Sequence, residues 1–298
     1  MHEKKVVVIL GPTASGKSAL AVTLAKSFGG ELISADSRQV YKGMQILTGI
    51  LQPPAGIVQH LVNFVEPTET YSVKTFKHDA EAIIAEIHEH KALPILVGGT
   101  ALYIDAVLDN WQMPSVSPDP VLRLELQEIY AREGLGALVR RLSKKDPAAL
   151  TVVDVVNPRR IMRALEVAYS LGNWSAVARE KSTPKYNVLR IGITIDRVEL
   201  RRKIAARVSE MFAAGVVEET KSLLLRYPSA STVMTSIGCD ALIAHIHGIM
   251  TREECEEKIV TKSYQYARRQ MTWWKKDKRI QWTSSEESAI ALVRKFLS

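Results

Sequence analysis

Cysteine is scarce in this chain, and its scarcity excludes several kinds of protein. Only Cys239 and Cys255 occur among 298 residues, and they form no Cys-x-x-Cys pair. This argues against a disulfide framework or a zinc site. No apolar run approaches the roughly 18 residues that span a bilayer, and the amino terminus, MHEKK, carries no signal-peptide pattern. We therefore expect a soluble, cytoplasmic protein without membrane contact.

Acidic residues are fewer than basic ones. Lysine and arginine total 40 against 32 aspartates and glutamates, which gives a net charge of +8. Residues 260–282 carry seven basic side chains, including Arg268 and Arg269, and one acid, Asp277, interleaved with tyrosines and tryptophans. Basic groups neutralise phosphates, and aromatic rings stack on unpaired bases. The tryptophans alone are more typical of a core, but the whole cluster favours a nucleic-acid partner.

The octapeptide GPTASGKS follows the apolar run Val6–Leu10 and opens an apolar-periodic stretch that ends at Phe28. It has the spacing and the strand–loop–helix context of a phosphate-binding loop, in which backbone N–H groups converge on phosphate oxygens. Lys17 supplies a charge for the terminal phosphates, and the Ser18 hydroxyl is a candidate ligand for Mg²⁺. The candidate phosphate-binding residues are Gly11, Pro12, Thr13, Ala14, Ser15, Gly16, Lys17 and Ser18.

Short β-rich runs alternate with helical patterns in the first hundred residues. Candidate strands at 31–34 and 94–97 follow the first one, a helical pattern covers 73–91, and a strong strand pattern returns at 188–195. Such βαβ alternation predicts a parallel sheet with helices on both faces. The predicted fold class is therefore α/β, with a P-loop NTPase-like core.

The segment 110–182 breaks this alternation, because it is almost entirely helical in pattern after a linker punctuated by prolines. The simplest interpretation is a helical insertion domain at 110–182 within a core formed by residues 1–109 and 183–298. The part of the core after residue 197 is expected to be mainly helical.

The position of the acidic residue separates classes of P-loop protein. Hydrolytic members usually carry an acid at the end of a later buried strand, where it helps to hold Mg²⁺. Here the strand at 94–97 ends in Gly98-Gly99-Thr100, and the carboxylate follows the strand at 31–34 instead, as Asp36. Asp36 could take a proton from a nucleophile that attacks a phosphorylated electrophile. The surrounding Ser-Ala-Asp-Ser is also typical of turns, so Asp36 could instead be a helix cap or a turn residue.

Five segments carry a family resemblance: GPTASGKS, SADSRQVYKGM, GGTALY, NPRRIMRALEV and RRQMTWW. Together, and over nearly the whole chain, they resemble the tRNA dimethylallyltransferase family of bacterial type. The resemblance implies transfer of a dimethylallyl group from dimethylallyl diphosphate to N6 of adenosine 37, in tRNAs that read codons beginning with U. It also implies Mg²⁺, a monomer, and a phosphate loop that binds diphosphate, with ATP binding left open.

The resemblance further assigns roles to single residues. Asp36 is the expected general base, Thr100 a donor to the diphosphate, and Lys17 a stabiliser of the leaving group. The diphosphate-binding arginine of the family is not in its usual place, so Lys203 or Arg207 is expected to replace it. The residues implied to contact tRNA, together with those of the basic cluster, are Asp36, Ser37, Arg38, Gln39, Thr100, Arg123, Arg159, Arg160, Ile161, Met162, Arg163, Arg268 and Arg269.

Three other functions share parts of this pattern. An adenylate isopentenyltransferase would use free nucleotides and would not need the insertion arginines. A P-loop small-molecule kinase would use Asp36 to activate a hydroxyl group. An RNA-binding NTPase is disfavoured because no acid follows the strand at 94–97.

Overall fold

The chain divides into two compact units in the computed structural model, which describes residues 4–114, 116–117, 119–175 and 183–298. The sheet unit comprises Met1–Leu108 together with Pro184–Ser298, and the helical unit comprises Asp109–Thr183. In the part of the chain that is described, no helix is both long enough and apolar enough to cross a membrane.

The sheet unit is built on six strands in the order β3-β2-β4-β1-β5-β6, and every pairing is parallel. The strands are β1 (Lys5–Leu10), β2 (Gly30–Ser34), β3 (Gln59–His60), β4 (Leu93–Val97), β5 (Asn187–Ile193) and β6 (Ile280–Thr283). The predicted parallel sheet is thus confirmed. The sequence does not predict β3, which is two polar residues, or β6, whose sequence IQWT is not a continuous apolar run.

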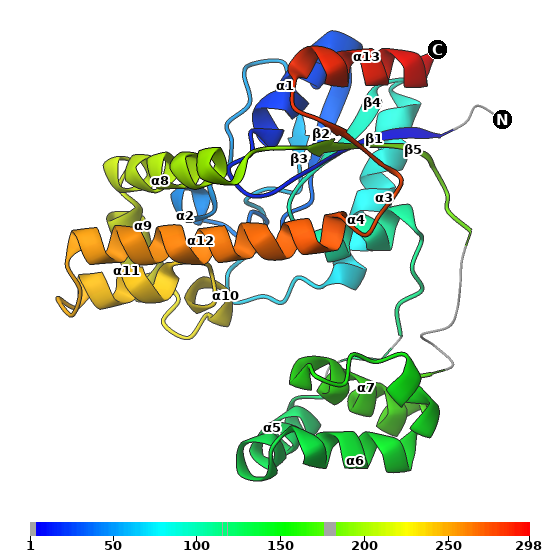
Figure 1. Cartoon of the computed structure of the whole chain (residues 1–298), viewed down its shortest axis with the longest axis vertical. Coiled ribbons are helices and arrows are strands. Elements are labelled where there is room, and N and C mark those ends of the chain that lie inside the picture. Colours follow the sequence, from blue (N-terminus) through cyan, green and yellow to red (C-terminus); the bar gives the residue numbers. More distant parts are fainter. Residues whose placement is uncertain (1–3, 115, 118, 176–182) are drawn as a thin grey trace. The chain divides into compact units, whose positions relative to one another are not determined.

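Helices cover both faces of the sheet (Figure 1), as predicted. The helices of the sheet unit are α1 (Lys17–Phe28), α2 (Gln45–Thr48), α3 (Val73–Glu89), α4 (Ala101–Leu108), α8 (Arg197–Ala213), α9 (Val216–Arg226), α10 (Ser231–Met234), α11 (Cys239–Ile246), α12 (Arg252–Trp274) and α13 (Glu286–Leu297). Along β1, Val6, Val8 and Leu10 pack into one core and Val7 and Ile9 into another, since successive strand side chains point to opposite faces. The first core includes side chains of α3, α4, α8 and α12, and the second those of α1 and α13.

The carboxyl ends of β1, β2 and β4 lie side by side because these strands are parallel neighbours. Val97 at the end of β4 pairs with Ile9 of β1 and with Ser34 of β2. The loops that follow the three strands therefore meet at one edge of the sheet. This is the edge at which open α/β sheets bind their ligands.

The long helix α12 completes the sheet unit at that edge. It begins with a capping box, in which Thr251 and Glu254 each bind the other's backbone N–H. Near its end Trp274 is buried in the first core, with 1% of its surface exposed. This tryptophan is therefore a core residue, which is the interpretation that the composition favours for tryptophans taken alone.

The helical unit contains α5 (Pro120–Glu133), α6 (Leu135–Lys145), a 3-10 helix at Pro147–Thr151 and α7 (Pro158–Leu171). Two of these helices, α5 and α7, start with a side-chain cap. Asp119 and Asn157 cap α5 and α7, and a proline follows each cap within the first turn. Leucines, isoleucines and alanines from all three helices form a separate small core.

Candidate active site

The phosphate loop runs from the end of β1 to the start of α1. Gly16 precedes α1 with φ of 91°, and no side chain caps the helix. A residue with a Cβ rarely adopts this conformation. The N–H groups in the first turn of α1 are therefore left for an anion, at the positive end of the helix.

Lys17 is half-buried at the end of this loop, and its Nζ donates a hydrogen bond to the carbonyl of Pro12 at 2.7 Å. Burial lowers the pKa of Lys17 from its usual value of 10.5 to about 7, with a smaller lowering from the charge of Arg207 and an opposing effect of Asp36. A bound diphosphate would favour the charged ammonium. The charge of Lys17 is thus coupled to the presence of an anion.

A cavity of about 690 Å³ lies over the phosphate loop and the ends of β2 and β4. Among its lining residues are Thr13, Ala14, Ser15, Gly16, Lys17, Ser18, Asp36, Gln39, Gly98, Gly99, Arg207, Tyr266 and Gln270. The fold thus brings together the loop, the carboxylate and the guanidinium that the sequence singles out. Gly11, Pro12, Thr100 and Lys203 are not lining residues.

Asp36 and Thr100 follow β2 and β4, which are neighbours in the sheet. The amide of Ser37 donates to Thr100 Oγ1 at 3.1 Å, and the amide of Thr100 donates to the carbonyl of Ala35 at 3.1 Å. These two bonds tie the loops together beside Asp36. Asp36 Oδ1 also accepts a hydrogen bond from the backbone amide of Arg38 at 2.9 Å, which stabilises the turn. The same residue lines the cavity, so Asp36 is both a turn residue and part of the cavity wall.

Arg38 and Gln39 differ in their surroundings, although both are expected to contact tRNA. The guanidinium of Arg38 donates to the carbonyl of Thr232 at 2.9 Å and to Thr235 Oγ1 at 3.0 Å. Gln39 lines the cavity and accepts a hydrogen bond from Ser34 Oγ at 2.9 Å. Gln39 is therefore placed toward a ligand, whereas Arg38 fastens its loop to the α10 segment.

Arg207 lines the cavity and Lys203 does not. Arg207 donates to Thr13 Oγ1 at 3.1 Å and to the carbonyl of Thr48 at 3.0 Å, and burial lowers its pKa. Lys203 lies one turn earlier on α8, where its Nζ is 4.0 Å from Glu199. Of the two candidates, only Arg207 is positioned beside the phosphate loop.

Ser18 lies in the first turn of α1 and lines the cavity. Among the residues that the structure describes, no group of three or more His, Cys, Asp or Glu side chains could hold a metal ion. Mg²⁺ commonly keeps several waters and binds through one or two protein oxygens plus substrate phosphates. The Ser18 hydroxyl beside a phosphate-binding loop fits that mode of binding and not a metal site made of protein groups alone.

Tyr266 and Gln270 line the cavity, although the sequence analysis places them only in the basic, aromatic cluster and in the RRQMTWW segment and assigns neither to the site. They are four residues apart on α12, so they share one helical face. Burial raises the pKa of Tyr266 to about 12, which keeps its hydroxyl protonated. The neighbouring Arg268 and Arg269 are exposed. The sequence offers one signal for this placement. Tyr266 and Gln270 lie four residues apart in a basic, solvent-facing stretch, so both can face the interior from one side of the helix.

The helical unit carries the second group of expected tRNA contacts. Arg159 and Arg160 are exposed at the start of α7, and Arg160 lies 3.6 Å from Asp154. Ile161 and Met162 belong to the core of the unit, with exposed fractions of 0% and 7%. The side chains of these two apolar residues therefore hold the unit together and are not part of its surface.

Arg123 and Arg163 both bind the carboxylate of Glu166, whose side chain has no exposed surface. Arg123 donates through Nε and Nη2 at 2.7 and 3.0 Å, and Arg163 donates through Nη1 at 2.9 Å. A buried carboxylate needs such partners, because a charge without one is costly in a protein interior. These two arginines have a structural role within the helical unit.

The fold and the cavity define an α/β protein of P-loop type, with a phosphate-binding loop at the ligand-binding edge of its sheet. The family model described as IPP transferase matches residues 39–277, and the model described as isopentenyl transferase matches residues 4–61. The first of these covers most of the chain. The chain belongs to the IPP transferase family.

Individual relatives agree with this assignment. The tRNA dimethylallyltransferase of Thermomicrobium roseum is 39% identical over 94% of this chain and 86% of its own length. That of Carboxydothermus hydrogenoformans is 38% identical over 99% and 97%. The crystal structure of the tRNA isopentenylpyrophosphate transferase of Bacillus halodurans has a TM-score of 0.72 and 34% identity, covering 99% of this chain and 96% of that one. A eukaryotic dimethylallyltransferase acting on tRNA has a TM-score of 0.83 and 29% identity, covering 98% and 79%.

Proposed function

We propose that this chain transfers a dimethylallyl group from dimethylallyl diphosphate to N6 of adenosine 37 in tRNAs that read codons beginning with U. The observation that carries the proposal is that a single cavity holds an anion-binding loop and the Asp36 carboxylate. The loop suits a diphosphate leaving group, and the carboxylate suits the acceptance of a proton. The names of the similar proteins supply the expectation that the attacked substrate is tRNA.

The reaction breaks the bond between the allylic carbon and the diphosphate oxygen, and it forms a bond between that carbon and N6. Lys17, Arg207 and the first-turn amides of α1 stabilise the negative charge on the departing diphosphate. Asp36 accepts the proton that N6 loses. Thr100 donates its hydroxyl hydrogen to a diphosphate oxygen. Mg²⁺ held by Ser18 and phosphate oxygens would supply further positive charge.

Adenosine 37 has to leave its stack to reach this cavity, as bases do in other enzymes that modify them. The exposed Arg268 and Arg269 on α12, and Arg159 and Arg160 on α7, are the proposed contacts to the tRNA backbone. Such contacts neutralise phosphates and position the nucleic acid. Ser37 and Gln39, beside the proposed base, are the proposed contacts to the extruded nucleotide.

The test is incubation of the purified protein with labelled dimethylallyl diphosphate and unmodified tRNA that carries adenosines 36, 37 and 38, followed by nucleoside analysis. We expect N6-(dimethylallyl)adenosine and one equivalent of diphosphate. A tRNA with guanosine at position 37 is the matched negative control. Prenylation of AMP as fast as of an anticodon stem-loop would assign the chain to the adenylate enzymes instead. ADP formation with a small alcohol, and no use of dimethylallyl diphosphate, would assign it to the kinases.

A further inference from the structure

The side chain of Gln270 bridges two loops of the candidate site. It is buried, with 6% of its surface exposed, and it lines the cavity. Its Oε1 accepts a hydrogen bond from the amide of Thr13 at 2.9 Å, and its Nε2 donates to the carbonyl of Gly99 at 2.9 Å. The backbone N–H of Thr13 can only donate, and the backbone carbonyl of Gly99 can only accept. These two partners therefore fix which end of the Gln270 carboxamide faces each loop.

The contact with Gly99 leaves no spare room. A Cβ added to Gly99 would lie 2.2 Å from Gln270 Nε2, so a side chain at this position would expel the glutamine. Gly99 immediately precedes Thr100, and Thr13 lies within the phosphate loop. One carboxamide therefore bridges the two loops, beyond the point where the pairing of β1 with β4 ends.

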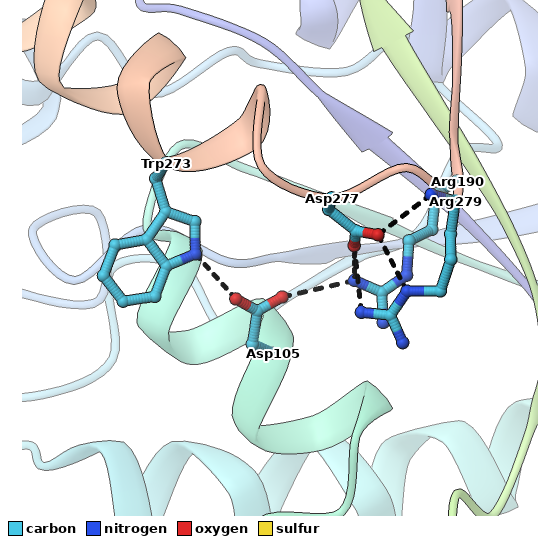
Figure 2. A network of polar contacts seen from close by, with 5 residues as sticks. All are labelled: Asp105, Arg190, Trp273, Asp277 and Arg279. Atoms are coloured by element: carbon cyan, nitrogen blue, oxygen red, sulfur yellow. Dashed lines mark hydrogen bonds and ion pairs between the residues drawn. The ribbon is translucent and has the colours of Figure 1, made fainter. Parts of the chain in front are cut away.

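The helix that carries Gln270 is itself held in register, as Figure 2 shows. Three residues further along α12, Trp273 Nε1 donates to Asp105 Oδ2 of α4 at 2.7 Å. Arg190 of β5 pairs with Asp105 at 3.3 Å and with Asp277, just after α12, at 2.7 Å. Arg279 also pairs with Asp277.

Asp105 and Arg190 in this network are almost fully buried. Removing one partner of a buried ion pair is strongly destabilising, so the end of α12 has little freedom to slide. α4 begins directly after Thr100. The network therefore fixes Gln270 relative to both the sheet and the Thr100 loop.

We infer that Gln270 is a positioning residue of the transfer reaction, which holds the Thr100 hydroxyl at a fixed distance from the anion-binding amides of α1. Gln270 occupies the Thr13 amide, and the amide of Ser15 donates to the carbonyl of Pro12. These two loop amides are thus already bonded, whereas the amides in the first turn of α1 are left for the diphosphate. The inference rests on the proposed function, since it assigns Thr100 to the leaving diphosphate.

The decisive variant is Gln270→Met, which keeps the length of the side chain and removes both hydrogen bonds. Misplacement of a reacting group by about 1 Å can cost about 10²-fold in rate, so we expect kcat to fall about 10–100-fold while KM for tRNA stays within a few-fold. Gln265→Met, on the exposed face of the same helix, is the matched control and should keep the wild-type kcat. Thermal unfolding of both variants checks that the fold is retained.

A double-mutant cycle with Thr100→Ala separates positioning from general damage. If Gln270 acts through Thr100, Gln270→Met should cost much less in the Thr100→Ala background than in the wild type. The inference would be overturned if Gln270→Met kept the wild-type kcat, or if the losses in activation free energy of the two single variants added up to that of the double variant. Either result would leave the proposed function intact. An inactive wild type would instead overturn the proposed function itself.

Gln270→Glu provides a second test should Gln270→Met fold poorly. One glutamate oxygen can still accept from Thr13, but the other faces the carbonyl of Gly99 and can donate only when protonated. The kcat of the glutamate variant, relative to wild type, should therefore rise as the pH falls from 8 to 6. A purely structural role would give a ratio that does not change with pH, which would count against the inference.

Discussion

The backbone amide of Ser37 donates a hydrogen bond to Thr100 Oγ1 at 3.1 Å and so joins the loop after β2 to the loop after β4. Asp36 immediately precedes the donor, so the proposed base and the proposed diphosphate donor are held next to each other. A hydroxyl oxygen that accepts from the backbone keeps its own hydrogen for another partner. That hydrogen is directed at Ser37 Oγ over a long distance of 3.5 Å, so we expect a diphosphate oxygen to replace Ser37 as its acceptor.

Replacement of Thr100 tests this arrangement directly. Thr100→Val keeps the shape and removes the hydroxyl, and we expect kcat to fall about 10²-fold because a donor to developing negative charge is lost. Thr100→Ser should restore most of the activity, since it returns the hydroxyl. Single-turnover rates with saturating dimethylallyl diphosphate give the comparison. Equal rates for the valine and serine variants would remove the hydroxyl from the mechanism.

Asp36→Asn keeps the hydrogen bond to Arg38 and removes the base. We expect kcat to fall on the order of 10²–10⁴-fold, as for other general bases, with little change in diphosphate affinity. Calorimetric titration with inorganic diphosphate serves as the control for the integrity of the site. Activity within a few-fold of wild type would show that N6 loses its proton elsewhere.

Lys17 makes diphosphate binding dependent on pH. Since its pKa in the free site is about 7, the ammonium is largely deprotonated at pH 8, and an anion that favours the charged form should draw in about one proton. Titrations in buffers of different ionisation enthalpy measure this uptake. Lys17→Arg, which stays charged, should lack it. The affinity of the wild type should fall as the pH rises above 7, and identical proton counts for both proteins would contradict the assignment.

Arg207 and Lys203 form a matched pair on α8. Arg207→Ala should weaken diphosphate binding about 10–100-fold, because hydrogen bonds to charged groups are worth about 1.5–3 kcal/mol each. Lys203→Ala should leave the affinity unchanged, since Lys203 does not line the cavity. Arg207→Lys should be intermediate, because the ammonium keeps the charge but loses the two-pronged geometry. A larger loss for Lys203→Ala than for Arg207→Ala would reverse this assignment.

Arg160→Ala tests the contact between the helical unit and tRNA. Loss of one phosphate contact should weaken binding and reduce the slope of log affinity against log salt by about 1. Arg132→Ala in the same unit removes an exposed arginine that pairs with Glu133, and it is the control. Filter binding at several salt concentrations gives both slopes. A slope for Arg160→Ala equal to that of the control would exclude the contact.

The sequence alone predicts the phosphate loop, the parallel sheet and the position of Asp36. These features are readable because they depend on local rules: glycine where the backbone needs φ of 91° at residue 16, and apolar runs for the buried strands. The short strands β3 and β6 carry no such signal. They form because neighbouring strands and helices offer backbone partners and burial, which a short segment without a continuous apolar run does not reveal.

What only the tertiary structure decides is which distant residues meet at the loop. Arg207 rather than Lys203 lines the cavity because of the face that α8 turns toward the loop. Gln270 reaches Thr13 from a position 257 residues further along the chain. A site that depends on local backbone geometry, such as the phosphate loop, can be predicted from a short segment of sequence. The contacts between α12, α8 and the strand ends cannot, because they arise from the packing of helices on the sheet.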